Sequence, residues 1–331
     1  MSSVIGTHSG KFHCDEVFAC FMLKQLPQFK DHSIVRTRDP KVLDECDIVV
    51  DVGGVYDHSK KRYDHHQKGF EETLNTLAIH NFNTKLSSAG LIYAHYGKDV
   101  IKALLPHADK KVVDLLYFKL YENFVEAVDA IDNGISQYDG VPRYRGVGGL
   151  SSRVGYFNPK WNEPDANADE RFQEAVKFVG GEFTLHVNYL ANTWWPARSI
   201  IEEAVEKRFE NDPSGRIVLL QNGGVPWQEH FFELEKEKNF ADDRVTYFVY
   251  QDTTSNNWRI QAIPVNENSK FENRLPLPES WRGLRDDDLS KETGIPGCIF
   301  AHMTGFIGGN QTKEGILAMA KASLANEAKV V

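Results

Sequence analysis

The first 52 residues alternate short apolar runs with helical stretches, and this alternation restricts the fold more than any other feature of the chain. Strands are predicted over 4–7, 33–37 and 47–52, with helical segments over 15–26 and 41–46. A β-α-β-α-β order predicts a parallel sheet, because each helical crossover returns the chain to the same sheet edge. The run 48–52 is rich in β-branched residues, as in a strand covered on both faces, so Asp51 is placed at a strand's carboxyl end.

The rest of the chain predicts a second α/β region. Helices are predicted over 87–96, 99–105, 110–131, 170–179, 196–209 and 313–326, strands over 217–220, 245–250, 258–264 and 298–302, and loops over 134–168. We therefore predict an α/β protein of two domains. A catalytic domain spans 1–175, a helical linker 176–215, and a smaller α/β substrate-binding domain 216–331, with the active site in the cleft between the domains.

Charge and cysteine content exclude several classes of protein. The 38 Lys and Arg against 47 Asp and Glu give a net charge of −9, which excludes a generally basic protein that coats nucleic acid. The four cysteines form no CxxC pair, so neither a disulfide framework nor a thiolate zinc site is predicted. No transmembrane or signal segment is evident. We expect no membrane partner and a cytoplasmic or nuclear location.

Metal-competent side chains gather where the predicted strands end. His8, His13 and Asp15 follow the first strand, Asp51 ends the third, and Asp64-His65-His66 and Asp132 follow later. An isolated His or Asp in a loop is usually a cap or a surface group. Several in one parallel α/β unit favour a metal site, because ligands of such sheets converge at the carboxyl edge. Mixed imidazole and carboxylate ligands suit Mn, Fe or Zn better than they suit Mg or Ca, which typically have only oxygen ligands.

These residues resemble the four metal motifs of the DHH phosphoesterase superfamily, which includes RecJ-type exonucleases, nanoRNA phosphodiesterases and manganese pyrophosphatases. The order of the motifs along the chain also matches. In the first motif, His13 stands where the superfamily usually has Asp. The resemblance implies a DHH-type parallel-sheet domain at the N-terminus.

A closer similarity is to the Myg family of exonucleases, a branch of the DHH group, and it extends over nearly the whole chain. The similar segments are 5–8, 12–16, 35–38, 63–67, 84–90, 131–136, 281–285, 295–298 and 305–309. The resemblance implies a metal-dependent 3′–5′ exonuclease that acts on the single-stranded 3′ ends of RNA. It also leaves a mitochondrial location open, although no transit peptide is evident.

The resemblance further implies a role for each site residue. Two divalent ions, Mn or alternatively Mg, would be held by His8, His13, Asp15, Asp51, His65 and Asp132, with Asp51 shared between them. Two ions about 3.5 to 4 Å apart can activate a water and stabilise the leaving oxygen in phosphodiester hydrolysis. Asp51, His66 and Asp64 would be the catalytic residues, the last two orienting ligands or contacting phosphate.

Substrate binding is expected partly in the C-terminal domain. Arg282 and Arg285 suit bidentate contacts to phosphate, and His302 lies close by in sequence. Relatives in the superfamily use a Gly-Gly-His turn there, and this chain has Gly308-Gly309 followed by Asn310. In the first domain, Lys85 is a further candidate contact to substrate.

Two alternatives remain open. The same metal core serves pyrophosphatases and small-nucleotide phosphodiesterases, although the Ser-Arg-Lys-Lys signature of the manganese pyrophosphatases is absent. A metal-binding regulator without turnover belongs to a different class of function. Retention of the complete ligand set argues against it. The RNA target and a homo-oligomeric state are not decided by the sequence.

Overall fold

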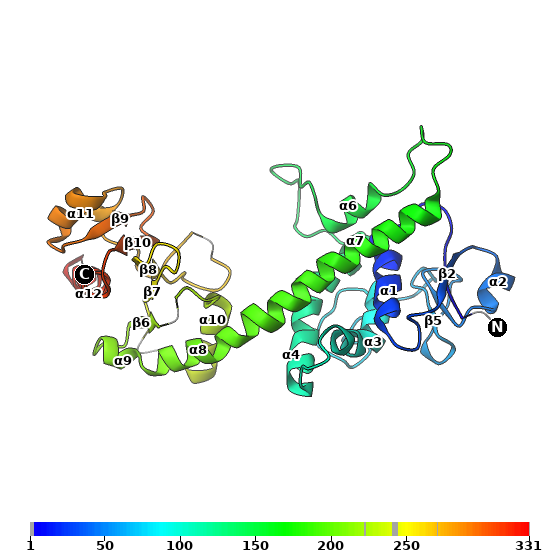
Figure 1. Cartoon of the computed structure of the whole chain (residues 1–331), viewed down its shortest axis with the longest axis horizontal. Helices are drawn as coiled ribbons and strands as arrows, with labels where there is room; N and C mark the ends of the chain where they lie inside the picture. The colour runs from blue at the N-terminus through cyan, green and yellow to red at the C-terminus, as the bar shows by residue number, and fades with distance from the viewer. Residues whose placement is uncertain (1–2, 222, 240–243, 270, 331) are drawn as a thin grey trace. The chain divides into compact units, whose positions relative to one another are not determined.

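The computed structural model describes residues 3–221, 223–239, 244–269 and 271–330. The chain divides into two compact units, Met1–Ala191 and Asn192–Val331, and each is described by itself (Figure 1). The boundary lies inside the segment 176–215 for which a helical linker is predicted. Among the described residues each unit contains a five-stranded sheet covered by helices, which confirms the mixed α/β class.

The sheet of the first unit is mostly parallel, as predicted. Its strand order is β2-β1-β3-β5-β4. Strand β1 pairs in parallel with β2 and β3, and β3 pairs in parallel with β5, whereas the edge strand β4 is antiparallel. The strands are β1 (Val4–Thr7), β2 (Ser33–Arg36), β3 (Ile48–Val50), β4 (Tyr56–Asp57) and β5 (Arg62–Tyr63).

Helix α1 (Cys14–Gln25) lies at the centre of the helices of this unit, packed against α3 (Ser88–Leu104) and α7 (Ala168–Tyr189) (Figure 1). The short α2 spans Pro40–Asp44. Two helices were expected over 87–96 and 99–105, but α3 is continuous. Gly97 lies inside this helix without breaking it. A Cβ at this position would lie 2.7 Å from the Tyr117 ring, so the glycine permits α3 to pack closely on α4.

The predicted helix over 110–131 is continuous but not uniform. It comprises α4 (Lys110–Leu120), a π-helical turn over Tyr121–Val125, and α5 (Glu126–Asp132). Such π-turns often occur near functional sites. The segment 134–168 was expected to be loops throughout, and this is wrong at α6 (Leu150–Gly155).

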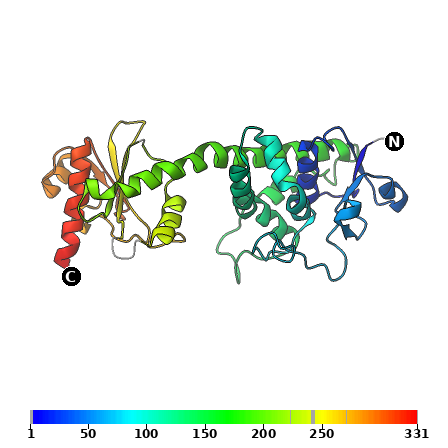
Figure 2. The same ribbon diagram turned by 90° about the horizontal axis from the view of Figure 1, so that it is seen from below.

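The second unit contains a mixed sheet of order β6-β7-β8-β10-β9, in which only β6 and β7 pair in parallel among the described residues. Helix α12 packs along β7, β8 and β10 (Figure 2). The predicted strands are confirmed, whereas β10, α10 and α11 were not predicted. The elements are α8 (Trp195–Glu206), α9 (Arg208–Asn211), β6 (Ile217–Leu220), α10 (Gln228–Lys238), β7 (Tyr247–Gln251), β8 (Trp258–Ala262), α11 (Asp286–Thr293), β9 (Cys298–Ala301), β10 (Ile307–Asn310) and α12 (Lys313–Val330).

The four cysteines are buried and free, so the expectation of no disulfide framework is confirmed. Among the helices of the described residues, none has the length and apolar character needed to span a bilayer.

Candidate metal centre

Five elements of the first unit bring the predicted ligands together. His8 follows β1, Asp51 follows β3 and His65 lies just beyond β5, so all three come from the carboxyl edge of the parallel strands. The first turn of α1 supplies Asp15, and the last residue of α5 is Asp132. The cluster is thus built by the topology of the sheet and by two helix ends.

Asp51 lies at the centre of this cluster. Its Oδ2 is 3.3 Å from His8 Nε2 and its Oδ1 is 3.3 Å from His65 Nε2, while Ser88 Oγ donates to Oδ1 at 3.0 Å. Burial opposes its ionisation, but the imidazoles of His65 and His8, each 3.3 Å away, outweigh burial and hold the pKa of Asp51 well below its usual range. The residue has a φ of +59°, a strained conformation for a non-glycine residue that is typical of functional sites.

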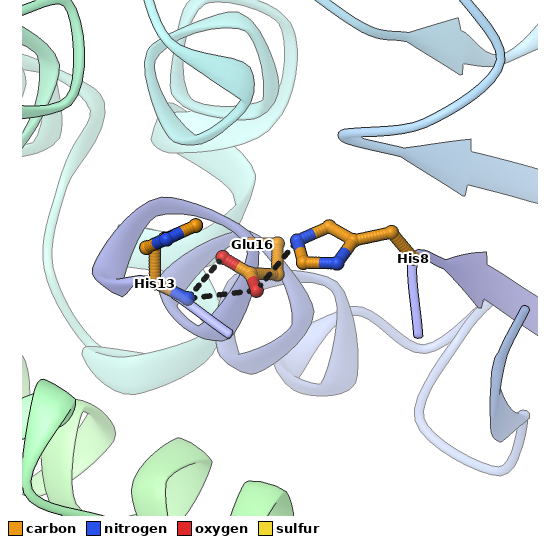
Figure 3. Close-up of side chains that lie close together, drawn as sticks. All are labelled: His8, His13 and Glu16. Atoms are coloured by element: carbon orange, nitrogen blue, oxygen red, sulfur yellow. Dashed lines mark hydrogen bonds and ion pairs between the residues drawn. The ribbon is translucent and has the colours of Figure 1, made fainter. Parts of the chain in front are cut away.

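One group of ligands forms on the His8 side of Asp51 (Figure 3). His8 Nε2 is 2.9 Å from Glu16 Oε1, and the Glu16 carboxylate accepts from the backbone N–H of His13 at 2.9 and 3.0 Å. Metal-competent atoms of His8, His13 and Glu16 all lie within 4.8 Å of one another. Glu16 is fully buried, and no role was predicted for it from the sequence. Its place beside Asp15 in the first turn of α1 was the available signal.

A second group forms on the other side, from Asp15, His65 and Asp132. Their ligand atoms also lie within 4.8 Å of one another, and His65 Nε2 is 3.1 Å from Asp132 Oδ2. None of the contacts of His65 Nε2 has hydrogen-bond geometry, and neither oxygen of the buried Asp15 has a hydrogen-bond partner among the described residues. Burial, with the nearby charge of Asp51 and Glu16, raises the pKa of Asp15 well above its usual value.

The donor set therefore fits divalent cations. Asp15, Glu16 and Asp51 are buried carboxylates whose ligand atoms lie within 4.8 Å of one another. Buried carboxylates this close repel one another unless protons or cations compensate their charge. Burial would lower the pKa of His8 and of His65, but the carboxylate oxygens that lie 2.9 to 3.3 Å from their Nε2 atoms raise each to about 10. Unpartnered oxygens on Asp15 are the strongest indication that a ligand atom belongs there.

Asp64 and His66 lie at the edge of the cluster. The buried Asp64 accepts from the backbone N–H of His66 at 3.1 Å, from His66 Nδ1 at 2.7 Å, and from the N–H of Gly54 at 2.6 Å. Asp64 thereby fixes the imidazole of His66, whose side chain is 62% exposed. His66 Nδ1 is also 3.5 Å from Asp51 Oδ1.

Lys85 is placed outside the ligand groups. Its Nζ lies 5.7 Å from the centre of the Phe70 ring, and that ring packs at 6.3 Å against the imidazole of His65. Lys85 and His65 thus approach the same aromatic ring.

The candidate substrate residues of the second unit lie along β9. Gly283 donates to Ala301 O at 2.9 Å and Ala301 donates to Leu284 O at 3.1 Å, so the segment carrying Arg282 and Arg285 runs beside this strand. Arg285 is exposed, whereas Arg282 Nε donates to Leu277 O at 2.9 Å. His302 follows β9 directly, is exposed, and packs its ring against Phe306.

The expected turn at Gly308-Gly309 is wrong. Both glycines lie in β10, where they pair with β8 on one side and β9 on the other. A Cβ at Gly308 would lie 2.9 Å from Leu277 Cδ1, and a Cβ at Gly309 would lie 2.9 Å from Phe300 Cε1. These glycines allow close packing within a strand, which explains them without a phosphate-binding turn.

Asp129 is a further buried carboxylate that the sequence did not reveal. It accepts from the backbone N–H of Ser87 at 3.0 Å, from Ser87 Oγ at 2.7 Å and from Tyr121 Oη at 3.0 Å. It thereby fixes the start of α3, where Ser88 reaches Asp51. Its position three residues before Asp132, on the same face of the helix, was the only signal. Burial raises the pKa of Asp129 to about 7 despite these hydrogen bonds.

Comparisons with known proteins agree on one family. A family model described as "Uncharacterised protein family (UPF0160)", MYG1_exonuc, matches residues 4–324. The chain is 66% identical over 325 residues to "MYG1 protein C27H6.8" of Caenorhabditis elegans, covering 98% of this chain and 96% of the relative. It is 51% identical to "MYG1 exonuclease" of Homo sapiens, covering 97% and 85% of the two chains. It is 45% identical to "MYG1 protein YER156C" of Saccharomyces cerevisiae, covering 98% and 96%. The chain therefore belongs to the MYG1 family.

Proposed function

We propose that this chain is a metal-dependent exonuclease that hydrolyses RNA from the 3′ end with two divalent ions. The observation that carries the proposal is Asp51, a buried carboxylate with one ligand group beside each of its oxygens. The name "MYG1 exonuclease" of mammalian relatives supports a nuclease. The relationship to the DHH superfamily, the RNA specificity and the cytoplasmic or nuclear location stay predictions.

The two ligand groups suggest how the ions would be held. His8, His13 and Glu16 would hold one ion, Asp15, His65 and Asp132 the other, and Asp51 would be shared. When bound, Mn²⁺ or Mg²⁺ would supply an activated water and charge stabilisation at the phosphate and the leaving oxygen. Glu16 is added here to the ligands predicted from the sequence. His13 is exposed, so we propose it as the most dispensable ligand.

Asp64 and His66 would act on the substrate phosphate. The bond from His66 Nδ1–H to Asp64, assigned from geometry, raises the pKa of His66. A protonated His66 then keeps Nε2–H as a second donor for a phosphate oxygen. In the second unit, Arg285, Arg282 and His302 are proposed to bind RNA phosphates, and Lys85 in the first unit is proposed as a further contact. Substrate contacts of Gly308 and Gly309 stay a prediction.

The test is product analysis with single-stranded RNA labelled at either end, a DNA strand of the same sequence, and pyrophosphate, each with Mn²⁺ or Mg²⁺. We expect RNA shortened stepwise from the 3′ end with release of mononucleotides, and no product from the Asp51→Asn variant. Release of orthophosphate from pyrophosphate alone would overturn the proposal in favour of a pyrophosphatase. Intact substrates throughout would favour a regulator that binds metal without turnover.

A further inference from the structure

Three cavities of the first unit adjoin one another in a row that starts at the metal centre. The first, of about 310 Å³, is lined by His8, Asp51 and His66 among others. The second, of about 500 Å³, shares His13 and His66 with the first, and it also includes Lys11 and Gly155. The third, of about 510 Å³, shares Lys11 and Gly155 with the second. The three cavities, of which neighbours share lining residues, are together called the α6 groove here.

The far end of the α6 groove presents an exposed aromatic side chain. Trp161 lines the third cavity and is 96% exposed, although a side chain of this size is normally largely buried. Lys160 lines the same cavity. Its Nζ donates to the backbone carbonyls of Asn158 and Tyr156, and these two hydrogen bonds hold the ammonium in place. Lys160 directly precedes Trp161 in the sequence. An exposed aromatic side chain and a cation that line one groove are the features with which proteins bind single-stranded nucleic acids.

The middle of the α6 groove carries a second cation. Lys11 lines both the second and the third cavity and is exposed, and among the described residues no carboxylate forms an ion pair with it. Two acidic side chains of the adjoining segment are already engaged. Glu163 accepts from the backbone N–H of Lys160 and pairs with Arg171, and Asp169 pairs with Arg36. The groove therefore offers unpaired positive charge between the metal centre and Trp161, in a chain of net negative charge.

We propose that the α6 groove binds the RNA strand upstream of the bond that is cleaved. This inference rests on the proposed function and adds a binding site within the first unit itself. The 3′-terminal phosphodiester would lie at the metal centre. Lys11 would contact a phosphate of the next nucleotides upstream, and a base still further upstream would stack on Trp161. Binding along the groove does not depend on base identity, because stacking and phosphate contacts accept any sequence.

Each contact has a distinct signature in binding experiments. Loss of a base stacked on Trp161 weakens binding by roughly fivefold or more, but only for strands long enough to reach it. Removal of the Lys11 charge lowers the slope of log Kd against log salt concentration by up to about 0.7, the value for one phosphate contact on a single strand. The shortest strand, a dinucleotide, would lie closest to the metal centre, so Trp161→Ala should change its affinity least.

The experiment measures affinity directly by fluorescence anisotropy, with Mn²⁺ and labelled phosphorothioate RNA that resists hydrolysis, in lengths from two to about ten nucleotides. The variants are Trp161→Ala, Trp161→Phe, which keeps an aromatic face, and Lys11→Ala. Lys102→Ala is the matched control for charge. It removes one exposed lysine near the far end of α3, about 20 Å along the helix from Ser88.

We expect Trp161→Ala to lose affinity increasingly with strand length, Trp161→Phe to restore most of it, Lys11→Ala to reduce the salt slope, and Lys102→Ala to do neither. Affinities of Trp161→Ala and Lys11→Ala equal to wild type at every length would overturn the inference, as would an equal loss on the dinucleotide and the longest strand. Hydrolysis of unmodified RNA by the wild-type protein is measured separately. Length-dependent loss of binding without any hydrolysis would keep the groove and reject the exonuclease, whereas hydrolysis without length-dependent loss would do the reverse.

Discussion

At the scale of single residues, Asp51 connects the backbone to the chemistry of the site. A left-handed φ costs an L-residue about 1 to 2 kcal/mol, so the fold must hold this conformation against strain. The hydrogen bond from Ser88 and the contacts with His8 and His65 are the interactions that hold it. These contacts place one carboxylate oxygen on each side of the cluster. We regard this strain as part of the preorganisation of the site.

The sequence predicted the ligands better than their surroundings. His8, Asp15, Asp51, His65 and Asp132 meet in one cluster because each lies at a strand or helix end, and periodicity locates such ends. Contacts between elements that lie far apart in the sequence could not be predicted in this way. For Glu16 and Asp129 the sequence offers only their positions near Asp15 and Asp132, whereas their burial and hydrogen bonding depend on how α1, α3 and α5 pack. No local pattern specifies that packing.

We predict that the affinity for Mn²⁺ rises steeply with pH. In the metal-free protein the pKa of His8 and of His65 is raised to about 10, so both are protonated at neutral pH. A ligand imidazole must be neutral, so metal binding releases these protons. Between pH 6 and pH 9, each released proton raises the apparent affinity about tenfold per pH unit. Calorimetry in two buffers of different ionisation enthalpy measures the number released. A value of zero would contradict the raised pKa values.

A second prediction concerns Asp129, whose pKa is raised from 3.8 to about 7 by burial. The folded protein then binds a proton here that the unfolded chain has lost. The contribution of this group to the free energy of unfolding is therefore complete below about pH 4 and is lost as pH rises through 7. We expect the stability of wild type relative to Asp129→Asn to fall between pH 5 and pH 8, measured by urea unfolding.

The control for this prediction is Asp114→Asn. Asp114 is partly exposed, and its pKa is lowered by a hydrogen bond from Lys98, so wild type should show no such fall relative to this variant. A stability difference between wild type and Asp129→Asn that stays constant from pH 5 to pH 8 would show that Asp129 is ionised in the folded protein.

At the scale of secondary-structure elements, α1 shows what the sequence can and cannot specify. The helix was predicted because its apolar run begins after a polar turn at His13. Its partners could not be predicted, because α3 and α7 lie far along the chain. The same limit explains Gly308 and Gly309. A pair of glycines is typical of a turn, and only the pairing of β10 with β8 and β9 shows that the pair lies in a strand.

Two adjacent glycines of α7 give a matched test of the α1–α7 contact. A Cβ at Gly180 would lie 2.2 Å from the ring of Phe21 on α1, whereas a Cβ at Gly181 meets nothing within 4 Å. We expect Gly180→Ala to lower the free energy of unfolding by about 1 to 3 kcal/mol through overpacking. Gly181→Ala should raise it by up to about 1 kcal/mol, because alanine favours the helix. Urea unfolding of the two variants measures both changes in the free energy of unfolding. Equal effects would mean that α7 does not pack closely on α1 at Gly180.

At the scale of the whole molecule, the candidate metal centre belongs to one unit alone. All of its ligands lie in Met1–Ala191, and the second unit has its own buried core around β6, β7 and β8. A ligand that binds only the folded state stabilises the unit that binds it. The two units should therefore respond differently to loss of the ions.

We predict that chelation lowers the melting temperature of the first unit and leaves that of the second unchanged. Removing the ions leaves Asp15, Glu16 and Asp51 to repel one another in a buried cluster. Calorimetric scans with Mn²⁺ and with a chelator measure both transitions, and the second unit is the internal reference. Equal shifts of both transitions, or no shift in either, would contradict a centre confined to the first unit.

The central claim is that Asp51 is shared by two divalent ions, and metal content tests it most directly. Each protein is equilibrated with Mn²⁺, and the bound metal per chain is measured in wild type, Asp51→Asn and His13→Ala. We predict two ions in wild type, loss of both in Asp51→Asn because both ligand groups adjoin this carboxylate, and retention of metal in His13→Ala when Mn²⁺ is in excess. Two ions still bound to the Asp51→Asn protein would contradict the shared carboxylate.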